Sequence, residues 1–174
     1  MNDEAYESLA ALGKVSFLLA PNHYHNKGLA EYAEAFPDAK LICSEHARPR
    51  LEKQTRMTFK PLSTIAPLLL DGCNMTEPEG LKTGEVWLTL ETSNNHIWVV
   101  CDAFTGSKTK LGGISKKVEL LGTFPTYGIN DHQTYKRWVD EKLNTHPPTM
   151  IIPCHGPIVQ SENVASDIKS LLGQ

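Results

Sequence analysis

Short apolar runs that end directly at histidine or aspartate recur along this chain and restrict the folds that it can adopt. The runs and their ends are residues 15–20 (VSFLLA) before Pro21-Asn22-His23-Tyr24-His25, residues 97–101 (IWVVC) before Asp102, and residues 149–152 (TMII) before Pro153-Cys154-His155. Apolar runs of this length, bounded by turn residues, are typical of buried β-strands. Ligands and catalytic groups of α/β proteins favour the carboxyl ends of strands. The sequence therefore predicts a site built from three strand ends.

The order of helical and extended segments predicts a mixed α/β (α+β) fold. The N-terminal part alternates a helix over 3–12, a strand over 15–20, a helix over 27–36 and a strand over 39–43. This β-α-β order implies parallel strands joined by helical crossovers. The middle is expected to be antiparallel, with strands over 65–70, 85–91 and 97–101 and a hairpin turn over 92–96. A helix over 131–143, a strand over 149–152 and a helix over 161–172 complete a layered sandwich.

Length and composition limit the classes of protein to which the chain can belong. Its 174 residues suit a single domain over 1–174, and 40% hydrophobic against 21% charged residues is a globular balance. A net charge of −3 argues against nucleic-acid binding. The apolar runs are far shorter than the roughly 20 residues of a membrane span. The acidic start, MNDEAYESLA, lacks the basic and apolar regions of a secretory signal, which predicts a cytoplasmic protein.

The cysteines are widely spaced and form no CxxC pair. They are Cys43, Cys73, Cys101 and Cys154. Their spacing argues against a structural zinc ribbon and against a disulfide framework. Cys43, Cys101 and Cys154 each end an apolar run, so buried thiols are expected, with a reactive thiol as the alternative interpretation.

Three histidines and one aspartate are the candidate metal ligands. His23 and His25 stand two residues apart, and in an extended segment such side chains point to the same side, so both imidazoles could meet one ion. Together with Asp102 and His155 they form a sufficient set for zinc, iron or manganese. Each residue also has a simpler interpretation, because loop histidines are common and an aspartate after a strand is usually a turn or cap residue.

Four segments of the chain carry a resemblance to a known family. LAALGKVSFLLAPNHYHNKGLAEYAEAFPDAKLI resembles a helix, a buried strand, a His-x-His-x-Asp-His loop and the helix and strand after it. GLKTGEVWLTLE resembles a Gly-His-Thr-x-Gly strand, IWVVCDAFTG a strand that ends at a metal-bridging aspartate, and TMIIPCHGPIV a strand with a Pro-Gly-His-Gly turn. This order is similar to that of the metallo-β-lactamase superfamily. The resemblance implies an αβ/βα layered sandwich that lacks part of the family's N-terminal sheet, because one helix and one strand precede His23 here.

Three of the family's usual ligand positions are substituted in this chain. By the resemblance, Lys27 and Gly28 stand at the family's aspartate and histidine after His-x-His, and Leu81 stands at the histidine of Gly-His-Thr. The ligand positions that remain are His23, His25, Asp102 and His155. The resemblance thus implies one divalent metal, zinc ahead of iron or manganese, or no metal. Lys27 is either an exposed lysine or a cation that pairs with Asp102 in place of the second metal.

Three functions are compatible with these residues. The first is a single-metal hydrolase in which metal-bound water attacks an ester, thioester, amide or phosphoester of a small-molecule substrate, with Asp102 as ligand or catalytic base. The second is a non-catalytic, metal-free relative that serves as a binding or scaffold protein. The third is a homo-oligomer or another partner-dependent form, in which a second chain completes the missing sheet.

Overall fold

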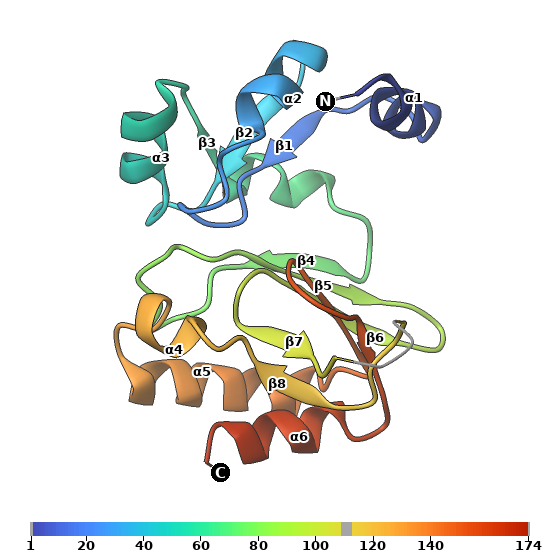
Figure 1. Ribbon diagram of the computed structural model, residues 1–174, viewed down its shortest axis with the longest axis vertical. Coiled ribbons are helices and arrows are strands. Elements are labelled where there is room, and N and C mark those ends of the chain that lie inside the picture. The colour runs from blue at the N-terminus through green and yellow to red at the C-terminus, as the bar shows by residue number, and fades with distance from the viewer. Residues whose placement is uncertain (1, 109–112, 174) are drawn as a thin grey trace.

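Two β-sheets face each other between outer layers of helices in the computed structural model, which describes residues 2–108 and 113–173 (Figure 1). The helices are α1 (Asp3–Ala11), α2 (Leu29–Ala35), α3 (Arg48–Thr55), α4 (Phe124–Tyr127), α5 (His132–Thr145) and α6 (Val164–Leu171). The strands are β1 (Phe17–Leu19), β2 (Lys40–Cys43), β3 (Lys60–Pro61), β4 (Cys73–Thr76), β5 (Trp87–Glu91), β6 (His96–Val100), β7 (Phe104–Gly106), β8 (Val118–Leu120), β9 (Met150–Pro153) and β10 (Val159–Gln160).

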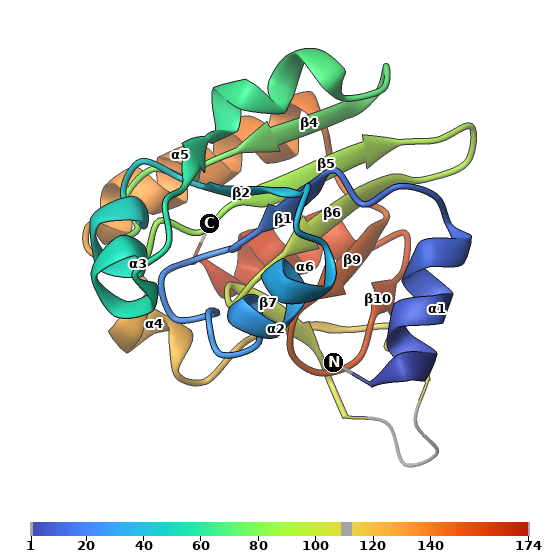
Figure 2. The same cartoon turned by 90° about the horizontal axis from the view of Figure 1, so that it is seen from above.

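The smaller sheet is parallel and comes from the N-terminal part of the chain. β2 lies between β1 and β3, with Leu18 opposite Leu41 and Ile42 opposite Lys60. α2 forms the crossover between β1 and β2 and buries Leu29. Helices α2 and α3 cover the outer face of this sheet in Figure 1, while α1 and α3 lie at its opposite ends in Figure 2.

The larger sheet has the strand order β10-β9-β6-β5-β4 and contains most of the core. β4, β5 and β6 are antiparallel neighbours, whereas β6 and β9 are parallel. Trp87 of β5 and Trp98 of β6 pack with ring centroids 5.3 Å apart, and Tyr135 of α5 meets Trp87 edge to face. α5 begins at Asp131, whose side chain accepts hydrogen bonds from two backbone amides of the first turn. The apolar side of α5 thereby covers the outer face of the sheet.

The predicted fold class is confirmed. The structure is a mixed α/β sandwich, with the expected parallel N-terminal strands and antiparallel middle. The predicted helices are present with shifted ends: the one expected over 27–36 begins at Leu29, the one expected over 161–172 begins at Val164, and the one expected over 131–143 extends to Thr145. Within the described parts of the chain, no helix is both long enough and apolar enough to cross a membrane.

The strand predicted over 65–70 is wrong. This segment follows one 3-10 helix, η1 (Leu62–Thr64), and contains a second, η2 (Ala66–Leu68). Pro67 has no amide hydrogen to donate to a ladder, and Leu68 and Leu70 are 65% and 78% exposed. The apolar run is therefore a surface connection between the two sheets. The short strands β3, β4, β7, β8 and β10 were not predicted, because they carry little hydrophobic pattern of their own.

Candidate functional site

Three side chains from different strand ends meet between the sheets. Nε2 of His25 lies 3.0 Å from Nε2 of His155. Oδ1 of Asp102 lies 3.3 Å from Nε2 of His155 and 3.7 Å from Nε2 of His25. We call these residues the His25–Asp102–His155 cluster. They follow β1, β6 and β9, so the structure brings together three of the four residues predicted as ligands.

Strand pairing explains how the cluster forms. The parallel register of β6 and β9 places Val100 opposite Pro153, so Asp102 and His155 leave the sheet at the same edge. The loop after β1 is hydrogen-bonded to the larger sheet: the amide of Val86 donates to the carbonyl of Pro21 at 2.8 Å. His25 thereby reaches the larger sheet from the smaller one.

Asn22 holds His25 and Asp102 in their positions. Its side chain is fully buried, and its Nδ2 donates to Oδ2 of Asp102 at 2.7 Å. Its Oδ1 accepts from the amides of Tyr24 (2.8 Å) and His25 (3.2 Å) and lies 2.9 Å from Nδ1 of His25. Because Oδ1 can only accept, Nδ1 of His25 carries the ring proton. Nε2 of His25 therefore presents its lone pair to the cluster.

Glu85 fixes the turn that carries Asp102. Its side chain is buried, and its carboxyl oxygens accept from the indole of Trp87 (2.7 Å) and the amides of Cys101 (3.1 Å) and Asp102 (3.1 Å). Burial raises the pKa of Glu85 to about 7, with the hydrogen bond from Trp87 opposing the shift. Possible metal-ligand atoms of Glu85, Cys101 and Asp102 also lie close together. The Glu85 oxygens, however, already accept hydrogen bonds from the indole and the two backbone amides.

Sequence reasoning missed both Asn22 and Glu85. Asn22 stands directly before His23, where it reads as an ordinary turn residue after a strand. Glu85 precedes an alternating strand, where a carboxylate is usually exposed. The available signal was Glu85 two residues before the core residue Trp87. Only burial, which the sequence does not show, distinguishes such a glutamate from one on the surface.

His155 is held by a turn that requires glycine. Its backbone carbonyl accepts from Oγ1 of Thr105 at 2.7 Å. Gly156, the next residue, has φ +82°, and a Cβ there would lie 2.1 Å from Oγ1 of Thr105. The Cys154-His155-Gly156 turn therefore packs against β7 too closely for any side chain at position 156.

The cluster has donor spacing that suits a metal ion. For metal–ligand bonds of about 2.0–2.2 Å, neighbouring donors of a tetrahedral site are separated by about 3.3–3.6 Å. The three separations of 3.0, 3.3 and 3.7 Å bracket this range. Burial lowers the pKa of His25, against the opposing charge of Asp102, so the neutral imidazole that binds metals is favoured. The residues present fit one divalent ion.

His23 is not part of the cluster. Residues 23 and 24 form a turn rather than an extended segment, so the two imidazoles of His-x-His do not share a side. The His23 ring is buried edge to face with Tyr24, at 4.3 Å between centroids, and its Nε2 has no hydrogen-bond partner in the described part of the chain. Burial, and next the charge of Arg50, lower the pKa of His23.

The substituted ligand positions have structural explanations. Of the two alternatives for Lys27, the structure agrees with the exposed lysine, because the ion-pair partners of Asp102 in the described part of the chain are His25 and His155. Gly28 begins α2, and Leu81 is buried in the core of the larger sheet.

Two pockets adjoin the cluster, and Tyr24, His25 and His155 line both. The first has a volume of about 620 Å³, an apolar lining and Lys27 in its wall. The second has a volume of about 450 Å³ and is open to Asp102. Further lining residues of the first are Leu18, Leu19, Leu29 and Tyr32, and those of the second are Thr83, Leu121, Phe124 and Tyr127.

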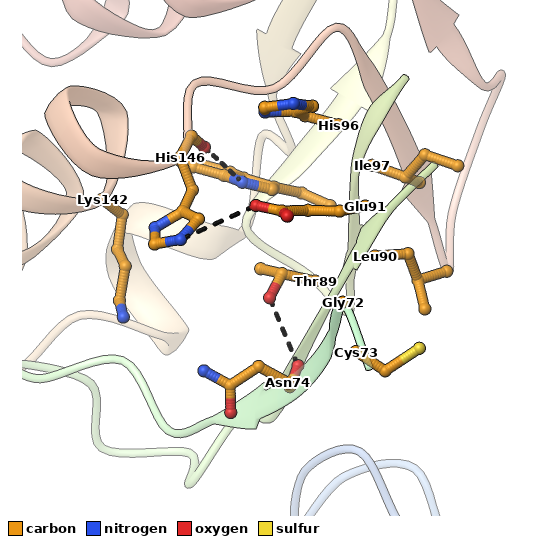
Figure 3. Close-up of a pocket in the computed structure, with 11 residues that line it drawn as sticks. Gly72, Cys73, Asn74, Thr89, Leu90, Glu91, His96, Ile97, Lys142 and His146 are labelled. Carbon is orange, nitrogen blue, oxygen red and sulfur yellow. Dashed lines mark hydrogen bonds and ion pairs between the residues drawn. The ribbon is translucent and has the colours of Figure 1, made fainter. Parts of the chain in front are cut away.

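A third pocket lies elsewhere, on β4, β5, β6 and the end of α5 (Figure 3). Its volume is about 220 Å³, and it contains an ion pair of 3.7 Å between His146 and Glu91. Its lining residues form no group of three metal-binding donors among the described residues.

Comparisons with known proteins give the fold. No protein-family profile matches this chain, and no curated protein sequence matches it. A metallo-β-lactamase from Pontibacter korlensis superimposes with a TM-score of 0.56 at 14% identity, over 98% of this chain and 75% of that one. A metallo-β-lactamase from Hirschia baltica gives 0.55 at 13%, over 97% and 73%. A metal-soaked Flv1 flavodiiron core from Synechocystis gives 0.55 at 14%, over 95% and 45%.

Proposed function

We propose that this chain, which has the metallo-β-lactamase fold, is a metal-dependent hydrolase whose His25–Asp102–His155 cluster holds one divalent ion. The observation that carries the proposal is the convergence of two imidazole nitrogens and one carboxylate oxygen within 3.0–3.7 Å of one another. Zinc is the first candidate, because two imidazoles and one carboxylate are a common catalytic zinc set. Iron is the alternative, since a flavodiiron core shares the fold.

A divalent ion at this position supplies Lewis acidity and lowers the pKa of a coordinated water. The chain's own residues prepare the site for it. Asn22 fixes the tautomer of His25 and orients Asp102, while Glu85 fixes the backbone that presents Asp102. His25, Asp102 and His155 would hold the ion with three protein ligands, the number typical of catalytic rather than structural zinc sites, and the two pockets adjoin these ligands.

Asp102 has a second role in the proposal. Its Oδ2 is occupied by Asn22, whereas Oδ1 faces the two imidazoles, and the side chain is 18% exposed. An oxygen in this position accepts a proton from an attacking water or binds the ion directly. Asp102 is therefore proposed as ligand or general base.

The two pockets suggest how a small-molecule substrate lies. The scissile ester, thioester, amide or phosphoester would stand at the cluster, with an apolar group in the larger pocket. Lys27 in the wall of that pocket supplies a positive charge for an anionic substituent.

Metal content of purified variants tests the proposal. After incubation with zinc at neutral pH and desalting, we expect about one ion per chain in the wild type and in His132→Ala, and loss of the ion in His155→Ala. His155 and His132 are both exposed, so the two substitutions are matched in their risk to folding. His23→Ala is expected to keep the ion. Retention of the ion by His155→Ala would overturn the proposed site.

Hydrolysis is tested separately on chromogenic esters, thioesters, amides and phosphoesters. We expect turnover of at least one class by the zinc-loaded wild type and by His132→Ala, and none by His155→Ala or after chelation. A metal-loaded wild type without turnover of any class would contradict the hydrolase part. A wild type that binds no ion would favour the metal-free binding or scaffold protein instead.

A further inference from the structure

Two cysteines lie next to each other directly behind the cluster. Cys101 follows β6 and Cys154 follows β9, one position beyond the paired residues Val100 and Pro153. The amide of Cys154 donates to the carbonyls of Val100 (3.1 Å) and Cys101 (3.3 Å). These contacts place the two cysteines next to each other where β6 and β9 end.

This arrangement meets the geometric requirement for a disulfide. Neighbouring strands lie about 4.7–4.9 Å apart, and disulfides join residues whose Cα atoms are about 4.4–6.8 Å apart. The backbone hydrogen bonds from the amide of Cys154 to the carbonyls of Val100 and Cys101 hold the two cysteines side by side at the ends of these neighbouring strands.

The two thiols differ in exposure. Cys154 is exposed, so the expectation that this thiol is buried is wrong, whereas Cys101 is buried. The turn at Gly156 carries the chain away from the sheet immediately after β9 and opens position 154 to solvent. An oxidant from solution therefore reaches Cys154 first, with Cys101 placed behind it to complete the reaction.

We propose that Cys101 and Cys154 form a reversible disulfide, with a low-molecular-weight disulfide such as glutathione disulfide as oxidant. The Cys154 sulfur attacks one sulfur of the oxidant, forms a mixed disulfide and releases one thiol. The Cys101 sulfur then attacks the Cys154 sulfur, forms the protein disulfide and releases the second thiol. Two protein thiols are oxidised, and the oxidant is reduced to two thiols.

The disulfide would lie in contact with the cluster. Sγ of Cys101 is 3.3 Å from Nδ1 of His25 and accepts from Nδ2 of Asn22 at 3.3 Å. Cys101 directly precedes the cluster residue Asp102, and Cys154 directly precedes the cluster residue His155. Oxidation thus converts the Cys101 thiol, which contacts both His25 and Asn22, into a disulfide sulfur.

The remaining cysteines serve as internal controls. Cys43 is buried in the smaller sheet, where burial raises the pKa of its thiol to about 11, and Cys73 lies on β4. The structure places neither of them beside Cys101 or Cys154. We expect both to keep free thiols.

The test is incubation of the reduced, chelator-treated chain with glutathione disulfide, followed by alkylation, mass spectrometry and peptide mapping. We expect two of the four thiols to be lost, a linked Cys101–Cys154 peptide to appear, and dithiothreitol to reverse both changes. Cys73→Ser should behave like the wild type, and Cys154→Ser should form no linkage. A lasting glutathione adduct on Cys154, a linkage between other cysteines, or four unchanged thiols would refute the proposal. The readout is independent of metal binding and hydrolysis.

Discussion

Replacement of Asn22 by alanine tests how the cluster is organised. Asn22→Ala removes the donor to Oδ2 of Asp102 and the acceptor that faces Nδ1 of His25. Without them the imidazole can rotate or change tautomer, and the carboxylate loses its fixed direction. The substitution touches no atom that points into the cluster, so its effect on metal binding isolates the contribution of orientation.

The expected magnitude follows from these contacts. Loss of a group that orients metal ligands typically weakens metal affinity by about 10–100-fold, which is about 1.4–2.8 kcal/mol. Stability also falls, because a hydrogen bond to a charged group contributes about 1.5–3 kcal/mol and the amides of Tyr24 and His25 lose their acceptor. Since Tyr24 and His25 are partly exposed and can bind water, we expect about 3 kcal/mol in total.

The assay is competition for zinc against a chromophoric chelator at neutral pH, together with urea unfolding of the metal-free chain. Asn26→Ala is the matched control, because Asn26 donates to the carbonyl of His23 and to Gln54 but does not contact the cluster. Equal zinc affinities for Asn22→Ala and Asn26→Ala, with both variants folded, would refute the proposed role of Asn22.

Two further predictions concern the supports of the cluster. Burial raises the folded-state pKa of Glu85 from 4.5 to about 7, so between these pH values the folded chain keeps a proton that the unfolded chain loses. Over this pH range, the contribution of Glu85 to the free energy of unfolding therefore falls by about 3 kcal/mol as pH rises. In urea unfolding of the metal-free chain at several pH values, Glu85→Gln should lack this contribution and the exposed control Glu162→Gln should retain it; identical pH dependences for the two would contradict the assignment. Gly156→Ala should lower the free energy of unfolding by about 1–3 kcal/mol, because its Cβ would clash with Thr105 at a positive φ. Gly13→Ala, also at positive φ but with no atom within 4 Å of the added Cβ, should lower the free energy of unfolding clearly less when both variants are unfolded in urea.

Much of the fold was predictable because hydrophobic period and turn residues act locally. The runs ending at Ala20, Cys43 and Cys101 are strands or strand ends in the structure, and the helix expected over 131–143 is α5, which Asp131 caps. The apolar run at 65–70 failed, since apolar character alone does not tell a buried strand from an exposed connection containing Pro67.

The candidate site was predictable only in part. Asp102 and His155 follow apolar strands, and the rule that ligands gather at strand ends predicts the proximity that the structure shows. His23 was grouped with His25 on the assumption of an extended segment, and a turn separates them. The direction of a loop side chain depends on a few backbone dihedrals, which the hydrophobic pattern does not determine.

The sequence by itself determined that this chain forms a layered α/β sandwich with histidine and aspartate at its strand ends, because burial of alternating and continuous apolar runs leaves few other arrangements. Only the tertiary structure decided which of those residues meet. The parallel register of β6 and β9 ends with Val100 opposite Pro153, so Cys101 and Asp102 leave the sheet beside Cys154 and His155. Burial turned Asn22 and Glu85 from ordinary polar residues into the supports of the cluster, since a buried polar group must satisfy its hydrogen bonds with whatever the fold brings near.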